Sequence, residues 1–329
     1  NNGTIAWSSA SSLLNFSGGS VTVNNNANID ITANAAMNNG GNGSSTLTIN
    51  NNSTGNITKS GTGTGTLGAG VTVSSTIGAV IFVSDGTLQF NAASLVNFGT
   101  LQFAASKTLD LVNATTSLNG NTSIIGAGNI NINGGTVSLG FAVQIPSGVA
   151  VNFSAGAMQG GNTIRFLNGA TMNWSGGEFR GLAGMIINNG ANLNITNTVG
   201  IKGDNLITNN GTVTWGSGST IEYGAGGTNA QIQNNGIFNI AGAAGIVDAG
   251  GGSNTFYFTN EASGTINKTI GNTTINAGTL FQNSGTVNIT SGSLNVGQYF
   301  APQDGSYNIG AAGELTGATV NFTGGTFTN

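Results

Sequence analysis

Ile207-Thr208-Asn209-Asn210-Gly211-Thr212-Val213-Thr214-Trp215 joins a turn to a short strand, and repeats of this stretch decide the fold. The Asn-Gly pair supplies a turn conformation that most residues resist, and apolar residues then occupy every second position. The pattern returns as Gly86-Thr87-Leu88-Gln89-Phe90 and as Gly285-Thr286-Val287-Asn288-Ile289. Each copy therefore predicts a turn followed by a short strand with one buried face.

The spacing between copies predicts how the strands pair. Copies follow Gly190, Gly211, Gly236, Gly264 and Gly285, whose positions differ by 21, 25, 28 and 21. A hairpin meander would repeat about every 8–12 residues, whereas this longer period leaves room for two or three strands per coil. We expect an all-β chain: a single-domain right-handed parallel β-helix (β-solenoid) of about 13–15 coils. The coils would stack about 4.7–4.9 Å apart, as one continuous domain over residues 1–329.

The composition supports a solenoid and argues against several functions. Glycine (57), asparagine (50) and threonine (42) are poor helix formers, yet 38% of the chain is hydrophobic, which is enough for a core. With six basic and ten acidic residues, the chain lacks the positive charge that binds nucleic acids or anionic membranes. No apolar run approaches the roughly 20 residues that span a bilayer. Because cysteine and histidine are absent, we expect no enzyme activity, no cofactor and no metal.

Asparagine pairs recur near the turn of the repeated stretch. When coils stack, amides at one corner of successive coils can hydrogen-bond to one another as a ladder. Surface asparagines without a ladder are the alternative. The candidates for the ladder or for the turn itself are Asn188, Asn189, Asn209, Asn210, Asn234 and Asn235.

The two ends of the sequence complete the same repeated stretch when they are joined. The residues concerned are Thr326, Phe327, Thr328 and Asn329 at one end and Asn1, Asn2, Gly3, Thr4, Ile5 and Trp7 at the other. The join contains one more asparagine than the internal copy. We therefore expect a segment or repeat unit of a longer structure, whose partner is another copy of itself or a flanking repeat, joined end to end. Whether the join is a peptide bond or a subunit interface stays open.

Four carboxylates form a candidate catalytic group on one face of the solenoid. Glu178, Asp204, Glu222 and Asp248 are separated by 26, 18 and 26 residues, each about one coil, with Arg165, Arg180 and Lys202 nearby. Two carboxylates facing a groove act as acid and base in β-helix glycosidases and lyases. The short glycine-rich loops favour solvated surface charges instead. Trp7, Trp174, Trp215 and Tyr223 are the corresponding candidates for stacking on sugars, with burial in the core as the alternative.

Two further motifs are weak. Gly63-Thr64-Gly65-Thr66-Leu67-Gly68 matches a dinucleotide-binding fingerprint by letter, but no βαβ unit surrounds it. Ice binding requires Thr-x-Thr at one register on a flat face. Pairs such as Thr46/Thr48 and Thr212/Thr214 do not recur at successive coil spacings, so we do not expect ice binding.

The stretches Phe281 to Ile289 and Ile207 to Trp215 resemble the β-helical repeats of bacterial secreted surface proteins. Passenger domains of autotransporters and filamentous-haemagglutinin-like adhesins are the nearest families. The resemblance implies an extracellular or cell-surface rod, used as a structural or adhesive element of a surface adhesin or self-assembling filament. Glycans or a host or neighbouring cell surface are the further partners that it implies. A carbohydrate-binding or carbohydrate-active β-helix is the competing function.

Overall fold

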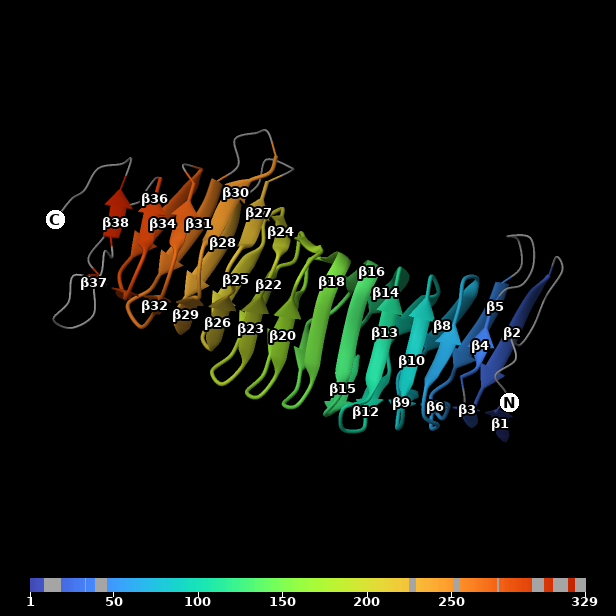
Figure 1. Ribbon diagram of the computed structural model, residues 1–329. Coiled ribbons are helices and arrows are strands. Elements are labelled where there is room, and N and C mark those ends of the chain that lie inside the picture. Colours follow the sequence, from blue (N-terminus) through green and yellow to red (C-terminus); the bar gives the residue numbers. More distant parts are fainter. Residues whose placement is uncertain are drawn as a thin grey trace. The chain divides into compact units, whose positions relative to one another are not determined.

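The computed structural model describes residues 1–8, 19–32, 34–38, 46–224, 229–250, 255–276, 278–297, 305–309 and, for the backbone, 319–322. Every regular element in these ranges is a β-strand. The chain divides into two compact units, residues 1–162 (unit 1) and 163–329 (unit 2). Each unit is a parallel β-solenoid, as the sequence predicts, and Figure 1 shows its strands stacked rung upon rung.

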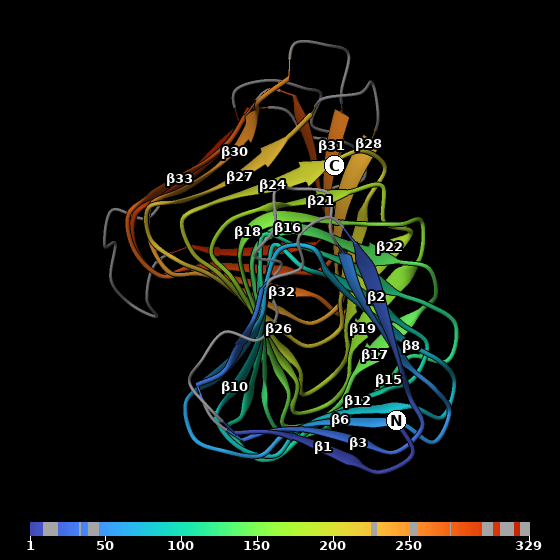
Figure 2. The same ribbon diagram turned by 90° about the vertical axis from the view of Figure 1, so that its right-hand side faces the viewer.

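In unit 1 each coil contributes strands to three rows. The first row contains β1 (Thr4–Trp7), β3 (Asn28–Ile31), β6 (Asn56–Lys59), β9 (Val80–Val83), β12 (Thr100–Phe103), β15 (Ser123–Gly126) and then β17 (Val143–Ile145). The second row contains β4 (Ala36–Met37), β7 (Thr64–Leu67), β10 (Thr87–Asn91), β13 (Thr108–Val112) and the first halves of β16 (Asn129–Leu139) and β18 (Ala150–Gln159). The third row contains β2 (Ser20–Asn25), β5 (Thr46–Asn51), β8 (Val71–Ser75), β11 (Ser94–Asn97), β14 (Ala114–Leu118) and the second halves of β16 and β18. Figure 2 shows β1, β3 and β6 of the first row side by side.

Unit 2 repeats this three-row plan. The first row contains β19 (Thr163–Phe166), β22 (Gly184–Ile187), β25 (Leu206–Asn209), β28 (Asn229–Asn234), β31 (Thr255–Asn260) and β34 (Thr279–Asn283). The second row contains β20 (Thr171–Trp174), β23 (Asn192–Ile195), β26 (Thr212–Trp215), β29 (Ile237–Ile240), β32 (Thr265–Lys268), β35 (Thr286–Ile289) and β37 (Ser306–Ile309). The third row contains β21 (Glu178–Arg180), β24 (Thr198–Lys202), β27 (Ser219–Tyr223), β30 (Ala244–Asp248), β33 (Asn272–Ile275), β36 (Ser293–Val296) and β38 (Thr319–Phe322).

The described strands make about 12 complete coils, six in each unit, with partial coils at β1–β2 and β37–β38. Coil length varies: the coil that begins with β3 at Asn28 is longer than the coil that begins with β9 at Val80. Because some coils are longer than expected, the described strands form about 12 complete coils instead of the expected 13–15. The right-handed sense and the single continuous domain stay predictions. The part of the chain described here contains no helix long and apolar enough to cross a membrane.

Alternate residues of each strand point into the core, which explains the period of two in the sequence. In unit 2 the second and first rows meet through aromatic contacts. The ring centroids of Trp215 and Phe238 are 6.2 Å apart, and those of Phe238 and Phe258 are 5.0 Å apart. All three side chains are fully buried. Turn glycines close the corners. At Gly86, with a φ of 61°, an added Cβ would lie 2.2 Å from the Gly63 carbonyl oxygen of the preceding coil, so only glycine fits.

Candidate functional site

A buried asparagine ladder runs through unit 2 at the end of the first-row strands. The side-chain amide of Asn209 donates to the side-chain oxygen of Asn234 at 2.7 Å, Asn234 donates to Asn260 at 2.7 Å, and Asn260 donates to Asn283 at 2.7 Å. The four residues are in register in β25, β28, β31 and β34, and all are fully buried. Each coil thus donates to the coil that follows it.

The ladder amides also satisfy backbone groups at the corner. The second amide hydrogen of Asn209 goes to the Ile237 carbonyl at 2.9 Å, and its oxygen accepts from the Gly211 N–H at 3.0 Å. Asn283 accepts from the Gly285 N–H in the same way, at 3.1 Å. A buried amide left without partners costs about 1–3 kcal/mol, so this bonding stabilises the corner as long as the ladder is complete.

Unit 1 contains a ladder of the same polarity. Asn1 donates to Asn25 at 2.8 Å, Asn25 donates to Asn51 at 2.8 Å, and Asn51 approaches the Ser75 hydroxyl at 3.5 Å. Asn97 occupies the next position in register with Ser75 and is also buried. The same hydrogen-bonding pattern therefore occurs in both units, at the ends of third-row strands in unit 1 and of first-row strands in unit 2.

The ladder candidates from the sequence divide into two groups. Asn209 and Asn234 lie in the ladder, whereas Asn210 is exposed and Asn235 half-buried. The assignment of Asn188 and Asn189 is wrong, because Ile187 is the residue in register with Asn209. β22 ends at Ile187, just before its Asn-Asn pair, whereas β25 ends at Asn209, the first residue of its pair, so the two pairs are alike in sequence but not in position.

The sequence reasoning missed Asn25, Asn51, Asn260 and Asn283, which are not all followed by a second asparagine. The sequence feature that could have identified them is their place in the inward-outward alternation of each strand. Asn260 continues the alternation of Phe256 and Phe258, so it had to point inward.

The candidate assembly residues at the start of the chain lie in and before β1. The side chain of Asn2 accepts from Asn26 at 3.1 Å, and Gly3 donates its N–H to the Asn1 side chain at 3.1 Å. β1 pairs with β3 from Thr4 to Trp7; Ile5 is 40% exposed, and Trp7 is buried. Thr326, Phe327, Thr328 and Asn329 lie outside the described residues.

A charged hollow lies on the outer face of the third row in unit 2. Glu178, Gly200 and Glu222 are in register on β21, β24 and β27. Glu178 forms an ion pair with Arg180, and the Lys202 ammonium lies 4.0 Å from the Glu222 carboxylate. The hollow, about 300 Å³ in volume, is lined by Glu178, Arg180, Lys202 and Gly203.

Gly200 has no side chain, and this leaves space between Glu178 and Glu222 on the outer face. A Cβ at this position would lie 2.7 Å from the Glu178 Cβ, so a larger residue would displace that side chain. The backbones of Glu178 and Glu222 are two strand spacings apart, about 9.5 Å. Inverting glycosidases hold their two carboxyl groups about 6.5–9.5 Å apart, so the separation of these two strands is comparable with that distance. The ion pairs are partly exposed, however, and such pairs contribute little to stability.

The structure separates the other two predicted carboxylates from this hollow. Asp204 lies in a corner and accepts a hydrogen bond from the Asn229 N–H at 2.8 Å, and Asp248 ends β30 and accepts from the Gly250 N–H at 2.9 Å. The 26-residue spacing was misleading, because the third-row register runs from Glu178 to Gly200 to Glu222 in steps of 22. The predicted row of four carboxylates is therefore wrong.

The aromatic candidates for sugar stacking point inward. Trp174, Trp215 and Tyr223 are fully buried and Trp7 is 4% exposed, so none offers a ring face to a glycan. Burial raises the pKa of the Tyr223 hydroxyl. The core interpretation holds for all four residues.

Two buried lysines were not anticipated from the sequence. Lys59 ends β6 at an inward position, in register with Ile31 and Val83, and its ammonium donates to the Gly61 carbonyl. Lys268 ends β32 between Ile240 and Ile289 and donates to the carbonyls of Gly242, at 3.1 Å, and Ile270. Both side chains are fully buried, and burial lowers the pKa of each. The same sequence feature applies, since each lysine stands two residues after an inward-facing isoleucine of its strand.

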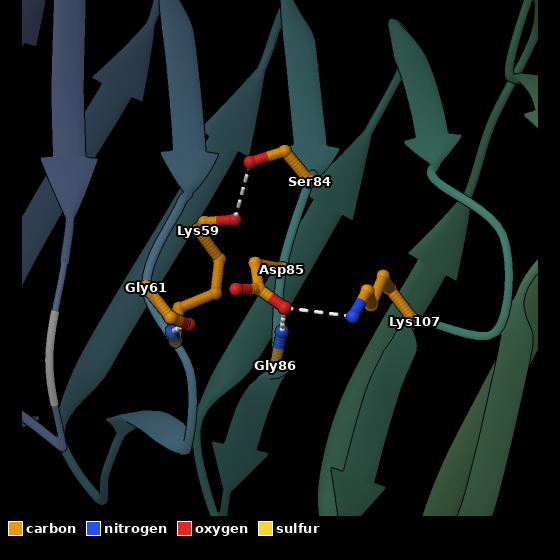
Figure 3. Close-up of polar contacts among 6 residues, drawn as sticks. All are labelled: Lys59, Gly61, Ser84, Asp85, Gly86 and Lys107. Carbon is orange, nitrogen blue, oxygen red and sulfur yellow. Dashed lines mark hydrogen bonds and ion pairs between the residues drawn. The ribbon is translucent and has the colours of Figure 1, made fainter.

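Lys59 belongs to a run of charges at one corner of unit 1, shown in Figure 3. The Asp85 carboxylate accepts from the Lys107 ammonium at 2.7 Å and from the Gly86 N–H at 2.8 Å. These hydrogen bonds lower the pKa of Asp85. Its charge, with that of Asp30, partly offsets the effect of burial on the pKa of Lys59. The run links successive coils and is structural.

No group of three or more acidic side chains arranged to hold a metal ion occurs in the described ranges. Comparison with protein-family models, curated proteins and solved structures finds no match for this chain.

Proposed function

We propose that this chain is a structural β-solenoid element of an extracellular surface adhesin or self-assembling filament, whose coils stack end to end, and that it is not an enzyme. The observation that carries the proposal is the buried asparagine ladder. From Asn209 to Asn283 every coil donates the same side-chain hydrogen bond to the coil that follows. A coil is thus a template for the next one.

The chemistry of this stacking does not depend on chain connectivity. Ladder partners are 23 to 26 residues apart in sequence and are held by parallel backbone pairing and amide bonds. A coil of another copy that presents an asparagine and a parallel strand would meet the same partners. Unpaired strand edges template such addition. This supports assembly with copies of the chain itself or with flanking repeats.

The surface supports an extracellular role in attachment. The chain carries 16 charged residues in 329, and two of its lysines are buried, so few charges are left for the surface. Such a surface contacts glycans and other cell surfaces through hydrogen bonds rather than through net charge. The stacked core supplies the stiffness.

Electron microscopy and sedimentation of the purified chain test the assembly. We expect rods that join into longer filaments as concentration rises. Asn234→Ala interrupts the ladder and should shorten the filaments, whereas Asn210→Ala, an exposed asparagine outside the ladder, should not. A wild-type chain that stays a monodisperse monomer at high concentration would contradict self-assembly. Failure to bind any cell or glycan surface would contradict the adhesive part.

The charged hollow supports the competing carbohydrate function. Glu178 and Glu222 lie on the same face, with Gly200 between them in register. A screen of polysaccharides with the wild type and with Glu178→Gln/Glu222→Gln separates the two functions. Asp204→Asn is the matched control, because its carboxylate is used at a corner. Cleavage or binding that the double variant loses and the control keeps would overturn the purely structural interpretation.

A further inference from the structure

The outer face of the second row in unit 2 carries two straight ranks of small polar side chains. We call it the second-row face. One rank contains Thr171, Asn192, Thr212, Ile237, Thr265, Thr286 and Ser306; the other contains Asn173, Asn194, Thr214, Asn239, Asn267, Asn288 and Asn308. Thr-x-Asn occupies three of the seven strands, β20, β32 and β35, and asparagine takes the second position on all but β26. Ile237 is the one apolar member, and none of the fourteen is ionised.

The ranks are continuous over all seven strands. Each strand from β20 to β37 pairs with the next in parallel and with no shift of register. The intervening residues, such as Val213 and Phe238, are buried and anchor the face from below. The same strands are seen in sequence from β20 to β32 in Figure 1.

The asparagine rank is held in place by its own hydrogen bonds. Asn194 donates to Asn173 at 2.8 Å, Asn267 donates to Asn239 at 3.0 Å, and Asn288 donates to Asn267 at 2.9 Å. Asn308 continues the rank with a bond to Asn288 at 2.8 Å. These amides have already lost their rotamer freedom, so ordering a ligand on them costs less conformational entropy.

The geometry of the face is that of a two-dimensional lattice. Neighbouring strands are about 4.7–4.9 Å apart, and residues two apart along a strand are about 6.6 Å apart. Ice presents water oxygens on its growth planes in rows whose repeats are close to both distances. An array of hydroxyl and amide groups with these repeats can order a water layer that merges with the ice lattice.

We propose that the second-row face of unit 2 binds ice. The sequence did not predict this, because Thr-x-Thr pairs do not recur from coil to coil. The register shows that what recurs is asparagine at the second position, on six of the seven strands, with threonine at the first position on four of the seven.

Other occupants fit the face less well. Six strand spacings by one four-residue strand give about 400 Å², half of the roughly 800 Å² per partner of a stable protein interface. A second copy is therefore a poor occupant. A glycan would find no aromatic ring among the two ranks. Ice, being periodic in two directions, gains a contact at every member.

The second row of unit 1 provides a contrast within the same chain. Its outward positions include Gln89, Asp110 and Ala150, so a longer amide, a carboxylate and a methyl group interrupt the ranks. The solenoid fold thus does not require an uncharged face with asparagine in one rank, and the regularity of that rank in unit 2 needs a separate reason.

Partition of the purified chain into slowly growing ice tests the proposal. We expect the wild type to be enriched in the ice fraction and to slow ice recrystallisation. Asn239→Lys places an ammonium in the middle of the face and should lose both effects. Thr274→Lys, on the exposed outer side of β33 in the third row, is the matched control and should keep them. Asn239→Thr keeps the lattice and should also bind.

Two results would overturn the proposal: exclusion of the folded wild type from ice, or equal partition of Asn239→Lys and Thr274→Lys. Circular dichroism and urea unfolding check that the variants are folded. If Asn239→Lys is not, Thr212→Lys on β26 is compared with the same control. The assay uses neither cells nor glycans, so it is independent of the adhesive role.

Discussion

Asn209 donates its side-chain amide to the oxygen of Asn234 in the following coil, at 2.7 Å. On the outer face of the same unit the direction is reversed, since Asn267 donates to Asn239 in the preceding coil at 3.0 Å. The inner ladder is fully buried and the outer one is half-exposed. The two ladders therefore hold the same coils together from opposite sides, but only the inner one has no water to replace a lost partner.

Removing one member of the inner ladder should destabilise unit 2. Asn234→Ala leaves the amide of Asn209 without its acceptor and Asn260 without its donor, a loss of about 1–3 kcal/mol. Asn235→Ala, one residue away and half-buried, should change stability by less than about 0.5 kcal/mol. Urea unfolding followed by circular dichroism measures both. Equal midpoints for the two variants would contradict a stabilising ladder.

Gly200 should not tolerate a side chain. Gly200→Ala puts a Cβ 2.7 Å from the Glu178 Cβ, and overpacking of this kind costs about 1–3 kcal/mol. Gly245 lies in the next but one coil of the same row, where an added Cβ meets nothing nearer than 3.9 Å. Gly245→Ala should be neutral or stabilising, because alanine loses less backbone entropy on folding. Thermal unfolding of the two variants gives the comparison, and a stable Gly200→Ala would show that the third row relaxes there.

Lys268 should make stability depend on alkaline pH. Burial lowers its pKa in the folded chain below the ordinary value of 10.5, so the unfolded chain binds the proton more tightly between the two values. Stability should therefore rise as the pH increases from the lowered pKa toward 10.5. Lys268→Met should remove this part of the slope, whereas Lys202→Met on the outer face should keep it. Urea midpoints from pH 7 to 11 test the prediction; parallel curves for wild type and Lys268→Met would refute it.

Asp85 should have the opposite dependence, at acidic pH. Hydrogen bonds from Lys107 and Gly86 lower its pKa from 3.8, so its contribution is complete above that value and is lost as the pH falls through the lowered pKa. We expect Asp85→Asn to be less stable than the wild type near pH 6 and the difference to vanish in strong acid. A double-mutant cycle with Lys107→Gln isolates the pair. No coupling between the two substitutions would mean that the Gly86 hydrogen bond alone accounts for the effect.

The fold could be predicted from the sequence because a period of two within strands, combined with a much longer period between copies of the repeat, leaves few alternatives. Leu193, Val213 and Phe238 show why: each is an inward residue of its strand, and the three lie in register on successive coils. The number of coils was less certain, because it depends on corner lengths, which vary while the strands do not.

The sites were predicted less well, because register across a corner cannot be read from letters. Asn188 resembles Asn209 in its local sequence, yet Ile187 takes the ladder position. Asp204 was grouped with Glu178 by spacing, yet the residue in register with Glu178 on the next coil is Gly200. The residue at which a strand begins after a corner decides which of its side chains face the core, and that residue is known only once the strands are paired.

Coils of unequal length, such as those that begin at Asn28 and at Val80, keep their strand pairing because the difference in length lies between the strands. The gene for such a protein can therefore gain or lose the codons of one whole coil and change the number of rungs without disturbing any contact elsewhere. Insertions within a corner are tolerated for the same reason, whereas a single-codon insertion within a strand reverses its two faces. The length of the solenoid can thus evolve without a change of fold, and selection can act on that length one coil at a time.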